Sequence, residues 1–317
     1  MPGLRTLVAA VIALFLPYAT ASAEVAVATS IKPVHSLVAA VMEGVGTPAL
    51  LVDGAGSPHS YSLKPSQAAA LENAEVIFWV GPALESFLAK PLATIAAEAR
   101  VTELMEVEGQ TLLGFREGGE FESHDDAEGP EHSANDPDMH AEEGAFNPHI
   151  WLDPRNAIVL VEQIETVLSE VDPEQATQYQ ANANKIVAKL ESLTEEIGEM
   201  LEAAREGKFI VFHDAYRYFE ERFDIHATGS VTVSPEVAPG AARIAEIKGR
   251  IRETETVCVF SEPQFEPKLI ATLIADTNAK SGVLDPLGAG LADGPELYFE
   301  LMRNMATTLV DCLADRG

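Results

Sequence analysis

Four residues with metal-binding side chains stand at or near the ends of short apolar segments. His213 stands at the end of the strand predicted in "FIVFHD", Asp285 at the end of "SGVLD", His59 in the Gly- and Pro-rich stretch "VDGAGSPHSY", and His149 in "NPHIW". Neutral imidazole suits Zn²⁺, and three histidines with one carboxylate or one water complete a tetrahedral site. Because these residues are far apart in the sequence, they can meet only if two lobes turn their strand ends toward one cleft. Taken singly, each histidine more often has a structural role, such as capping a helix or forming a hydrogen bond at a strand end, and only their shared position across two lobes makes a metal site an equal alternative.

The segments that would position these residues follow an alternating pattern of strands and helices. Before residue 107 the predicted strands are 24–30, 48–53 and 75–81, and the predicted helices are 32–45 and 64–74. After residue 207 the predicted strands are 208–214, 229–233, 257–262 and 281–285, and the predicted helices are 215–223, 240–254, 267–277 and 295–313. This alternation predicts an α/β fold of two lobes, each with a mainly parallel sheet flanked by helices. In such sheets ligands bind beyond the carboxyl ends of the strands.

A long helical segment, 156–207, separates the N-terminal lobe (24–155) from the C-terminal lobe (208–317). Its apolar positions advance by four and three residues and form one stripe along a helix: Tyr179, Ala183, Ile186, Leu190, Leu193, Ile197 and Leu201. A helix reaching Gly207 would span about 50 Å at 1.5 Å per residue. We interpret it as a rigid spine joining the lobes rather than as an ordinary core helix.

Residues 116–146 interrupt the first lobe with eleven acidic residues and almost no apolar ones. Such a segment cannot bury enough apolar surface to offset its ordering entropy, so we expect a disordered loop. His124, His132 and His140 recur in it every eight residues. We hypothesise that they collect zinc weakly or sense it, and the alternative is a solvated segment without such a role.

The first residues have the layout of a cleavable secretory signal. Arg5 precedes an apolar run too short to span a bilayer, and small residues at 21–23 precede Glu24. We therefore expect removal of residues 1–23 and export to the periplasm, with no lipid anchor because no cysteine lies near the cleavage point. Without Arg5 the formal charge is 20 − 50 = −30, which excludes nucleic acid as a partner.

The chain has two cysteines, Cys258 and Cys312. In an oxidising compartment an isolated pair favours a disulfide over a metal site. It would close a long loop and contribute about 4 kcal/mol in the chain-entropy account. We predict that it holds the C-terminal segment to the body of the protein.

Seven stretches together resemble one known family over nearly the whole chain: "TSIKPVHSLVAAVMEGV", "SPHSYSLKPSQAAALENAEVIFWVGPALE", "NPHIWLDP", "FIVFHDAYRYFEERF", "SPEVAPGAARIAEI", "CVFSEPQFEP" and "VLDPLGAG". The chain resembles the zinc-specific periplasmic solute-binding proteins of bacterial ABC importers, the ZnuA family. The resemblance implies that His59, His149 and His213 bind zinc and that Asp285 or a water completes the site. It also implies a disulfide between the cysteines and a spine helix that limits hinge closure.

Two positions refine what the resemblance implies. Some members carry Glu before the first ligand histidine, where this chain has Pro58, which leaves the fourth position to Asp285 or water. Manganese- and iron-binding relatives usually have a carboxylate where this chain has His213, and a third nitrogen favours zinc.

Glu262, at the end of a predicted strand, is either a hydrogen-bond acceptor for a ligand histidine or a surface acid.

We therefore predict a monomeric periplasmic receptor that captures Zn²⁺ as transported ligand and delivers it to an inner-membrane ABC permease, without catalysis. One alternative is a manganese or iron receptor of the same transporter class. Another is a secreted zinc hydrolase, which would need a general base beside a zinc-bound water, and the sequence has no HExxH motif. A third is an adhesin that merely contains a metal.

Overall fold

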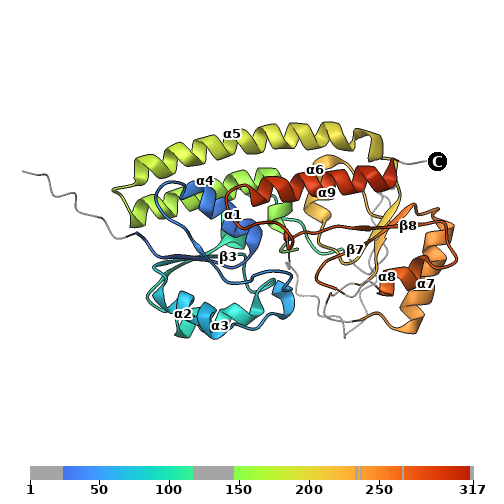
Figure 1. Cartoon of the computed structure of the whole chain (residues 1–317), viewed down its shortest axis with the longest axis horizontal. Helices are drawn as coiled ribbons and strands as arrows, with labels where there is room; N and C mark the ends of the chain where they lie inside the picture. The colour runs from blue at the N-terminus through green and yellow to red at the C-terminus, as the bar shows by residue number, and fades with distance from the viewer. Residues whose placement is uncertain (1–23, 117–145, 233–234, 236–237, 266–267, 315–317) are drawn as a thin grey trace, which may run out of the picture.

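The computed structural model describes residues 24–116, 146–232, 235, 238–265 and 268–314. The predicted signal at 1–23 lies outside these residues, and so do His124, His132 and His140, whose role stays a prediction. Two parallel sheets lie side by side, each with helices on both faces, and one long helix runs along both (Figure 1). This is the predicted α/β fold of two lobes.

The N-terminal lobe is a four-stranded parallel sheet in the order β2-β1-β3-β4. Proline stands in the first turn of two of its helices, where its missing N–H is not needed: Pro33 in α1 and Pro65 in α2. The elements are β1 (Val27–Thr29), α1 (Lys32–Val41), β2 (Ala49–Leu50), α2 (Pro65–Asn73), β3 (Val76–Trp79), α3 (Ser86–Thr94) and β4 (Arg100–Glu103).

The C-terminal lobe repeats this topology in the order β6-β5-β7-β8, again with every strand parallel. The chain order reverses between β5 and β7, which makes their carboxyl ends the switch point where ligands gather in such sheets. Its elements are β5 (Phe209–Val211), α6 (Arg217–Phe223), β6 (Gly229–Ser230), α7 (Ala241–Glu253), β7 (Cys258–Ser261), α8 (Lys268–Ile274), β8 (Lys280–Val283) and α9 (Leu297–Leu313).

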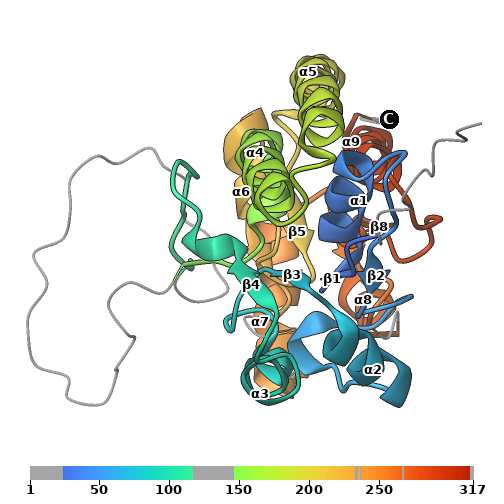
Figure 2. The same cartoon turned by 90° about the vertical axis from the view of Figure 1, so that its left-hand side faces the viewer.

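The central strands of both sheets are buried on both faces, and their successive side chains alternate between two cores. In β3, Val76 and Phe78 face a large core toward the long helix, whereas Ile77 and Trp79 face a smaller core toward α2 and α3. Strand β5 alternates in the same way. The large core is continuous across both lobes, so the lobes share one hydrophobic interior on this side. Figure 2 shows the long helix α5 on this side and α2 and α3 on the other.

Helices α4 (Pro154–Val171) and α5 (Ala176–Leu201) connect the lobes. All seven apolar positions predicted for the spine are buried in α5. Its 26 residues span about 39 Å, which is less than expected, because the helix ends at Leu201 and gives way to a 3-10 turn. No helix among the described residues is long and apolar enough to cross a membrane.

Some elements differ from the sequence-based expectation. Helix α3 and strand β4 were not predicted, since α3 contains Pro91 and β4 is a short, largely exposed edge strand. The strands that precede two candidate ligands are also shorter than expected. Strand β5 ends at Val211 and β8 at Val283, so His213 and Asp285 each lie two residues beyond a strand.

The predicted disulfide between Cys258 and Cys312 is confirmed. It joins the first residue of β7 to the last turn of α9, and both cysteines are buried. The disulfide thereby links helix α9 to the central strand β7 of the C-terminal sheet.

Replacing both cysteines with alanine should lower the free energy of unfolding by about 4 kcal/mol, because the unfolded chain loses a loop that spans 54 residues. Urea denaturation of the oxidised parent, the reduced parent and the double variant measures the effect. The reduced parent is the control and should resemble the variant. A loss below about 1 kcal/mol would contradict this role.

Candidate metal centre

Three imidazoles from separate parts of the chain converge in one cleft. His59 lies in a 3-10 turn after β2, His149 precedes the 3-10 turn Ile150–Leu152, and His213 follows β5. Nε2 of His149 lies 3.3 Å from Nε2 of His59 and 3.3 Å from Nε2 of His213. Among the described residues, these three form the only group of histidine, cysteine and acidic side chains close enough to hold a metal ion.

The spacing of the nitrogens fits a small tetrahedral ion. Two nitrogens bound at 2.0–2.1 Å to a tetrahedral Zn²⁺ are separated by about 3.3 Å. The two Nε2 separations of 3.3 Å therefore match the edge of a zinc coordination tetrahedron. Three nitrogens leave a fourth position for another ligand.

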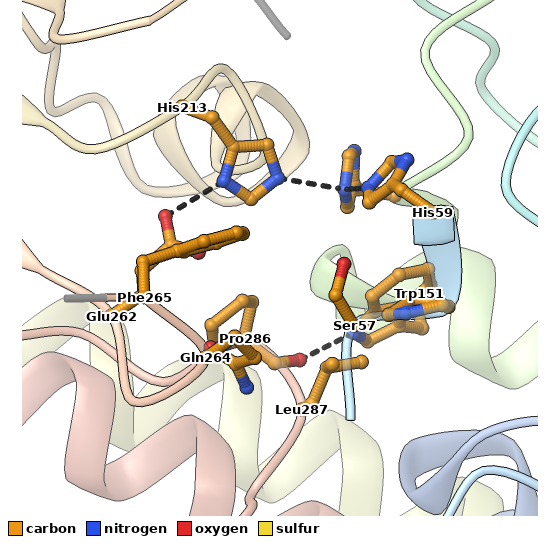
Figure 3. Close-up of a pocket in the computed structure, with 11 residues that line it drawn as sticks. Ser57, His59, Trp151, His213, Glu262, Gln264, Phe265, Pro286 and Leu287 are labelled. Atoms are coloured by element: carbon orange, nitrogen blue, oxygen red, sulfur yellow. Dashed lines mark hydrogen bonds and ion pairs between the residues drawn. The ribbon is translucent and has the colours of Figure 1, made fainter. Parts of the chain in front are cut away.

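The carboxylate of Glu262 orients His213. Its Oε1 lies 2.8 Å from Nδ1 of His213, and Glu262 is almost fully buried. A carboxylate only accepts hydrogen bonds, so Nδ1 is the donor, and the tautomer that this bond selects has its lone pair on Nε2. Figure 3 shows His213 between Glu262 on one side and His59 on the other. His213 follows β5 and Glu262 follows β7, so this pair spans the switch point of the C-terminal sheet.

The amide of Asn147 orients His149. Its Oδ1 lies 2.8 Å from Nδ1 of His149 and accepts the backbone N–H of His149 at 3.1 Å. Its Nδ2 donates to the carbonyl oxygen of Asp214 at 2.7 Å, which fixes which end of the amide faces the ring. Nδ1 of His149 therefore carries the proton, and its bare Nε2 faces the bare Nε2 of His213. Two facing lone pairs repel, and a cation between them removes the repulsion.

Sequence reasoning did not identify Asn147. The available signal was the Asn-Pro pair in "NPHIW", because Asn-Pro initiates turns and an Asn side chain often accepts the N–H two residues on. The observed bond from the N–H of His149 has this geometry.

Burial keeps His149 neutral. Desolvation first, and then the neighbouring imidazoles of His213 and His59, lower the pKa of His149 well below its ordinary value. A charged ring loses more by leaving water than a neutral ring. Because a metal binds neutral imidazole, His149 is held in its ligating form.

The three imidazoles separate two cavities. On one side, a cavity of about 10 Å³, enough for one water-sized particle, is bordered by Glu262, Phe265 and Trp151. On the other, an open cavity of about 290 Å³ is lined by all three histidines together with Phe115 and Asp214. The larger cavity gives an ion a route to the nitrogens.

The structure does not bring Asp285 into the histidine group. Its Oδ1 accepts the backbone N–H groups of Leu287 and Gly288 at 3.1 and 2.9 Å, and its Oδ2 accepts that of Ala289 at 2.6 Å. The carboxylate thus holds the loop after β8. As a metal ligand it would have to exchange these bonds for the ion.

Segments on both sides of the acidic insertion bind the C-terminal lobe next to the site. Arg116 forms ion pairs with Asp214 and with Glu220 of α6. The indole N–H of Trp151, two residues after His149, donates to the carbonyl oxygen of Pro286 at 2.8 Å. These contacts fix the position of His149 relative to His213.

Comparison with known proteins identifies close relatives. A family model described as "Zinc-uptake complex component A periplasmic" matches residues 27–312. The "High-affinity zinc uptake system protein ZnuA" of Brucella suis biovar 1 (strain 1330) is 50% identical over 305 residues, which cover 91% of each chain.

Two solved structures share the fold. The crystal structure of ZnuA matches with a TM-score of 0.75 at 26% identity, over 90% of this chain and 98% of that chain. The SBP FpvC from Pseudomonas aeruginosa in complex with Mn²⁺ matches with a TM-score of 0.76 at 19% identity, over 93% of this chain and 100% of that chain. The second likeness concerns the fold alone.

Substituting Asp285 with alanine tests its predicted place as a fourth ligand. Because its carboxylate holds three backbone N–H groups, we expect the variant to unfold more easily, by about 1–3 kcal/mol. We expect it to weaken zinc binding far less than His213→Ala does. Calorimetric titration and urea denaturation measure the two effects. A loss of affinity equal to that of His213→Ala would show that Asp285 leaves the loop to bind the ion.

Proposed function

The chain belongs to the family of periplasmic zinc-uptake components A, and from this membership we propose that it captures Zn²⁺ in the periplasm and delivers it to the membrane permease of an ABC importer. The observation that carries the proposal is the convergence of three imidazoles, with Nε2 of His149 at the edge length of a zinc tetrahedron from Nε2 of both His59 and His213. In this proposal residues 1–23 are the export signal and the receptor is a monomer.

We propose His59, His149 and His213 as the zinc ligands, with water from the larger cavity in the fourth position. Glu262 and Asn147 accept the Nδ1–H groups of His213 and His149, which directs both Nε2 lone pairs to the ion. Three nitrogens suit zinc better than manganese, which prefers oxygen ligands. This donor set therefore favours zinc over the manganese or iron alternative.

The same donors support capture without catalysis. A zinc hydrolase needs a free general base beside the zinc-bound water. The carboxylate of Glu262, which borders the small cavity, is engaged by His213. Neutral imidazoles also release a metal more readily than thiolates do, as delivery to a permease requires.

The first test is a calorimetric titration of the mature, metal-stripped protein with Zn²⁺ and with Mn²⁺, together with His213→Ala. We expect one tight zinc site, little response to manganese, and zinc binding weakened at least about 100-fold in the variant, because one of three nitrogens is lost. His226→Ala is the matched control, since His226 is half-exposed and lies beside Asp224 away from the cleft. Equal or tighter manganese binding, or a variant that binds like the parent, would refute the proposed function.

Zinc affinity should fall as the pH drops through about 6.5, because protons compete with the metal for imidazole. The lowered pKa of His149 keeps this ring neutral through that window, so it has no proton to release there. We therefore expect at most two protons released per zinc near pH 6, rather than three.

Titrations in buffers of different ionisation enthalpy count these protons. A control titration near pH 8 should release fewer protons than the titration near pH 6. A release of three protons near pH 6, or an affinity that stays constant from pH 8 to pH 5, would contradict this prediction.

A further inference from the structure

We infer that Asn147 is a positioning residue for the metal centre, which aims His149 at the ion and fixes it to the chain beside His213. The inference rests on the proposed function and assigns to Asn147 a part in it. Asn147 does not touch the ion in this account, and it acts through His149.

The side chain of Asn147 forms hydrogen bonds with His149, a proposed ligand, and with Asp214, the residue after the proposed ligand His213. Asn147 is fully buried, so water does not replace these bonds. The amide oxygen accepts from both the ring and the backbone of His149. The amide nitrogen donates to the carbonyl oxygen of Asp214, the residue after His213.

Asp214, whose carbonyl oxygen accepts the bond from Nδ2 of Asn147, is itself held in place. The side chain of Asp214 pairs with Arg116, which also binds Glu220 of α6 at 2.8 and 2.9 Å. The hydroxyl of Tyr218, also in α6, donates to the carbonyl oxygen of Asn147 at 2.8 Å. Asn147 is therefore anchored to the C-terminal lobe through both its side chain and its backbone. From this fixed position it orients His149, which follows the acidic insertion in the sequence.

An amide at this position has an effect that a carboxylate would not have. Hydrogen-bonded carboxylates raise the basicity of a ligating imidazole, as Glu262 is placed to do for His213. A neutral amide fixes the ring orientation with less gain in basicity. The two lobes thus hold their histidines by different means, one with a carboxylate and one with an amide.

Asn147→Ala tests the inference, with Asn156→Ala as matched control. Asn156 is equally buried and also joins backbone groups near the site, through bonds to Thr111 at 2.8 and 3.0 Å and to the carbonyl oxygen of Ile150 at 3.4 Å, but it does not contact an imidazole. We expect Asn147→Ala to weaken zinc binding about 10- to 100-fold and Asn156→Ala to stay within about threefold of the parent, at similar losses of thermal stability.

Asn147→Asp and the visible spectrum of bound Co²⁺ separate positioning from general destabilisation. The aspartate keeps an acceptor for Nδ1–H of His149, but it loses the donor to Asp214 and turns a second oxygen toward that carbonyl oxygen, so we expect it to recover part of the affinity that the alanine variant loses. The Co²⁺ bands, which report ligand geometry in the folded protein, should change in Asn147→Ala and not in Asn156→Ala.

The outcomes distinguish the inference from the function on which it rests. A parent that binds no zinc overturns both. If the parent and Asn156→Ala bind zinc tightly, the proposed function stands, and three results overturn the inference alone: Asn147→Ala within threefold of the parent, Asn147→Asp no better than alanine, or unchanged Co²⁺ bands in Asn147→Ala.

Discussion

The hydrophobic core that the two lobes share along α5 is the constraint on which the metal centre depends. It contains side chains from the central strands of both sheets, from the closing helix α9 and from the whole apolar stripe of α5. A large relative rotation of the lobes would expose part of this interior, at about 1.5–3 kcal/mol for each large apolar side chain exposed. The carboxyl ends of the two sheets are therefore held at a nearly fixed separation. That separation places histidines from both lobes within one tetrahedral edge of each other.

Within this frame the local hydrogen bonds set the chemistry of each ligand. The distance between the lobes brings the rings together, but it does not decide which nitrogen of each ring faces the centre. Glu262 and Asn147 decide this for His213 and His149, because each accepts a hydrogen bond from Nδ1–H. Burial then keeps His149 neutral. The site is thus prepared for a cation before a cation arrives, which reduces the reorganisation that binding requires.

The sequence allowed the fold to be predicted for a physical reason, because the stripe of α5 and the apolar strands are local patterns with the period of a helix or a strand. The positions of His59, His149 and His213 only suggested a common site, and their assignment as ligands came from the resemblance to a known family. Asn147 could not be identified in this way, because its role depends on a carbonyl oxygen 67 residues away. The surroundings of Asp285 were equally hidden, since a carboxylate at a strand end can face a cleft or hold its own loop. Pro91 concealed α3 because it interrupts the helical pattern.

The choice of ion must then come from the donors and not from the architecture. A fold does not by itself determine which ligand its site holds. In this chain the described carboxylates nearest the centre are already engaged: Glu262 by His213, Asp214 by Arg116 and Asp285 by its own loop. Three nitrogens remain directed at the centre, and nitrogen donors disfavour the harder, oxygen-seeking ions. In the proposed receptor, selectivity for zinc would therefore arise as much from the hydrogen bonds that occupy these oxygens as from the three histidines proposed as ligands.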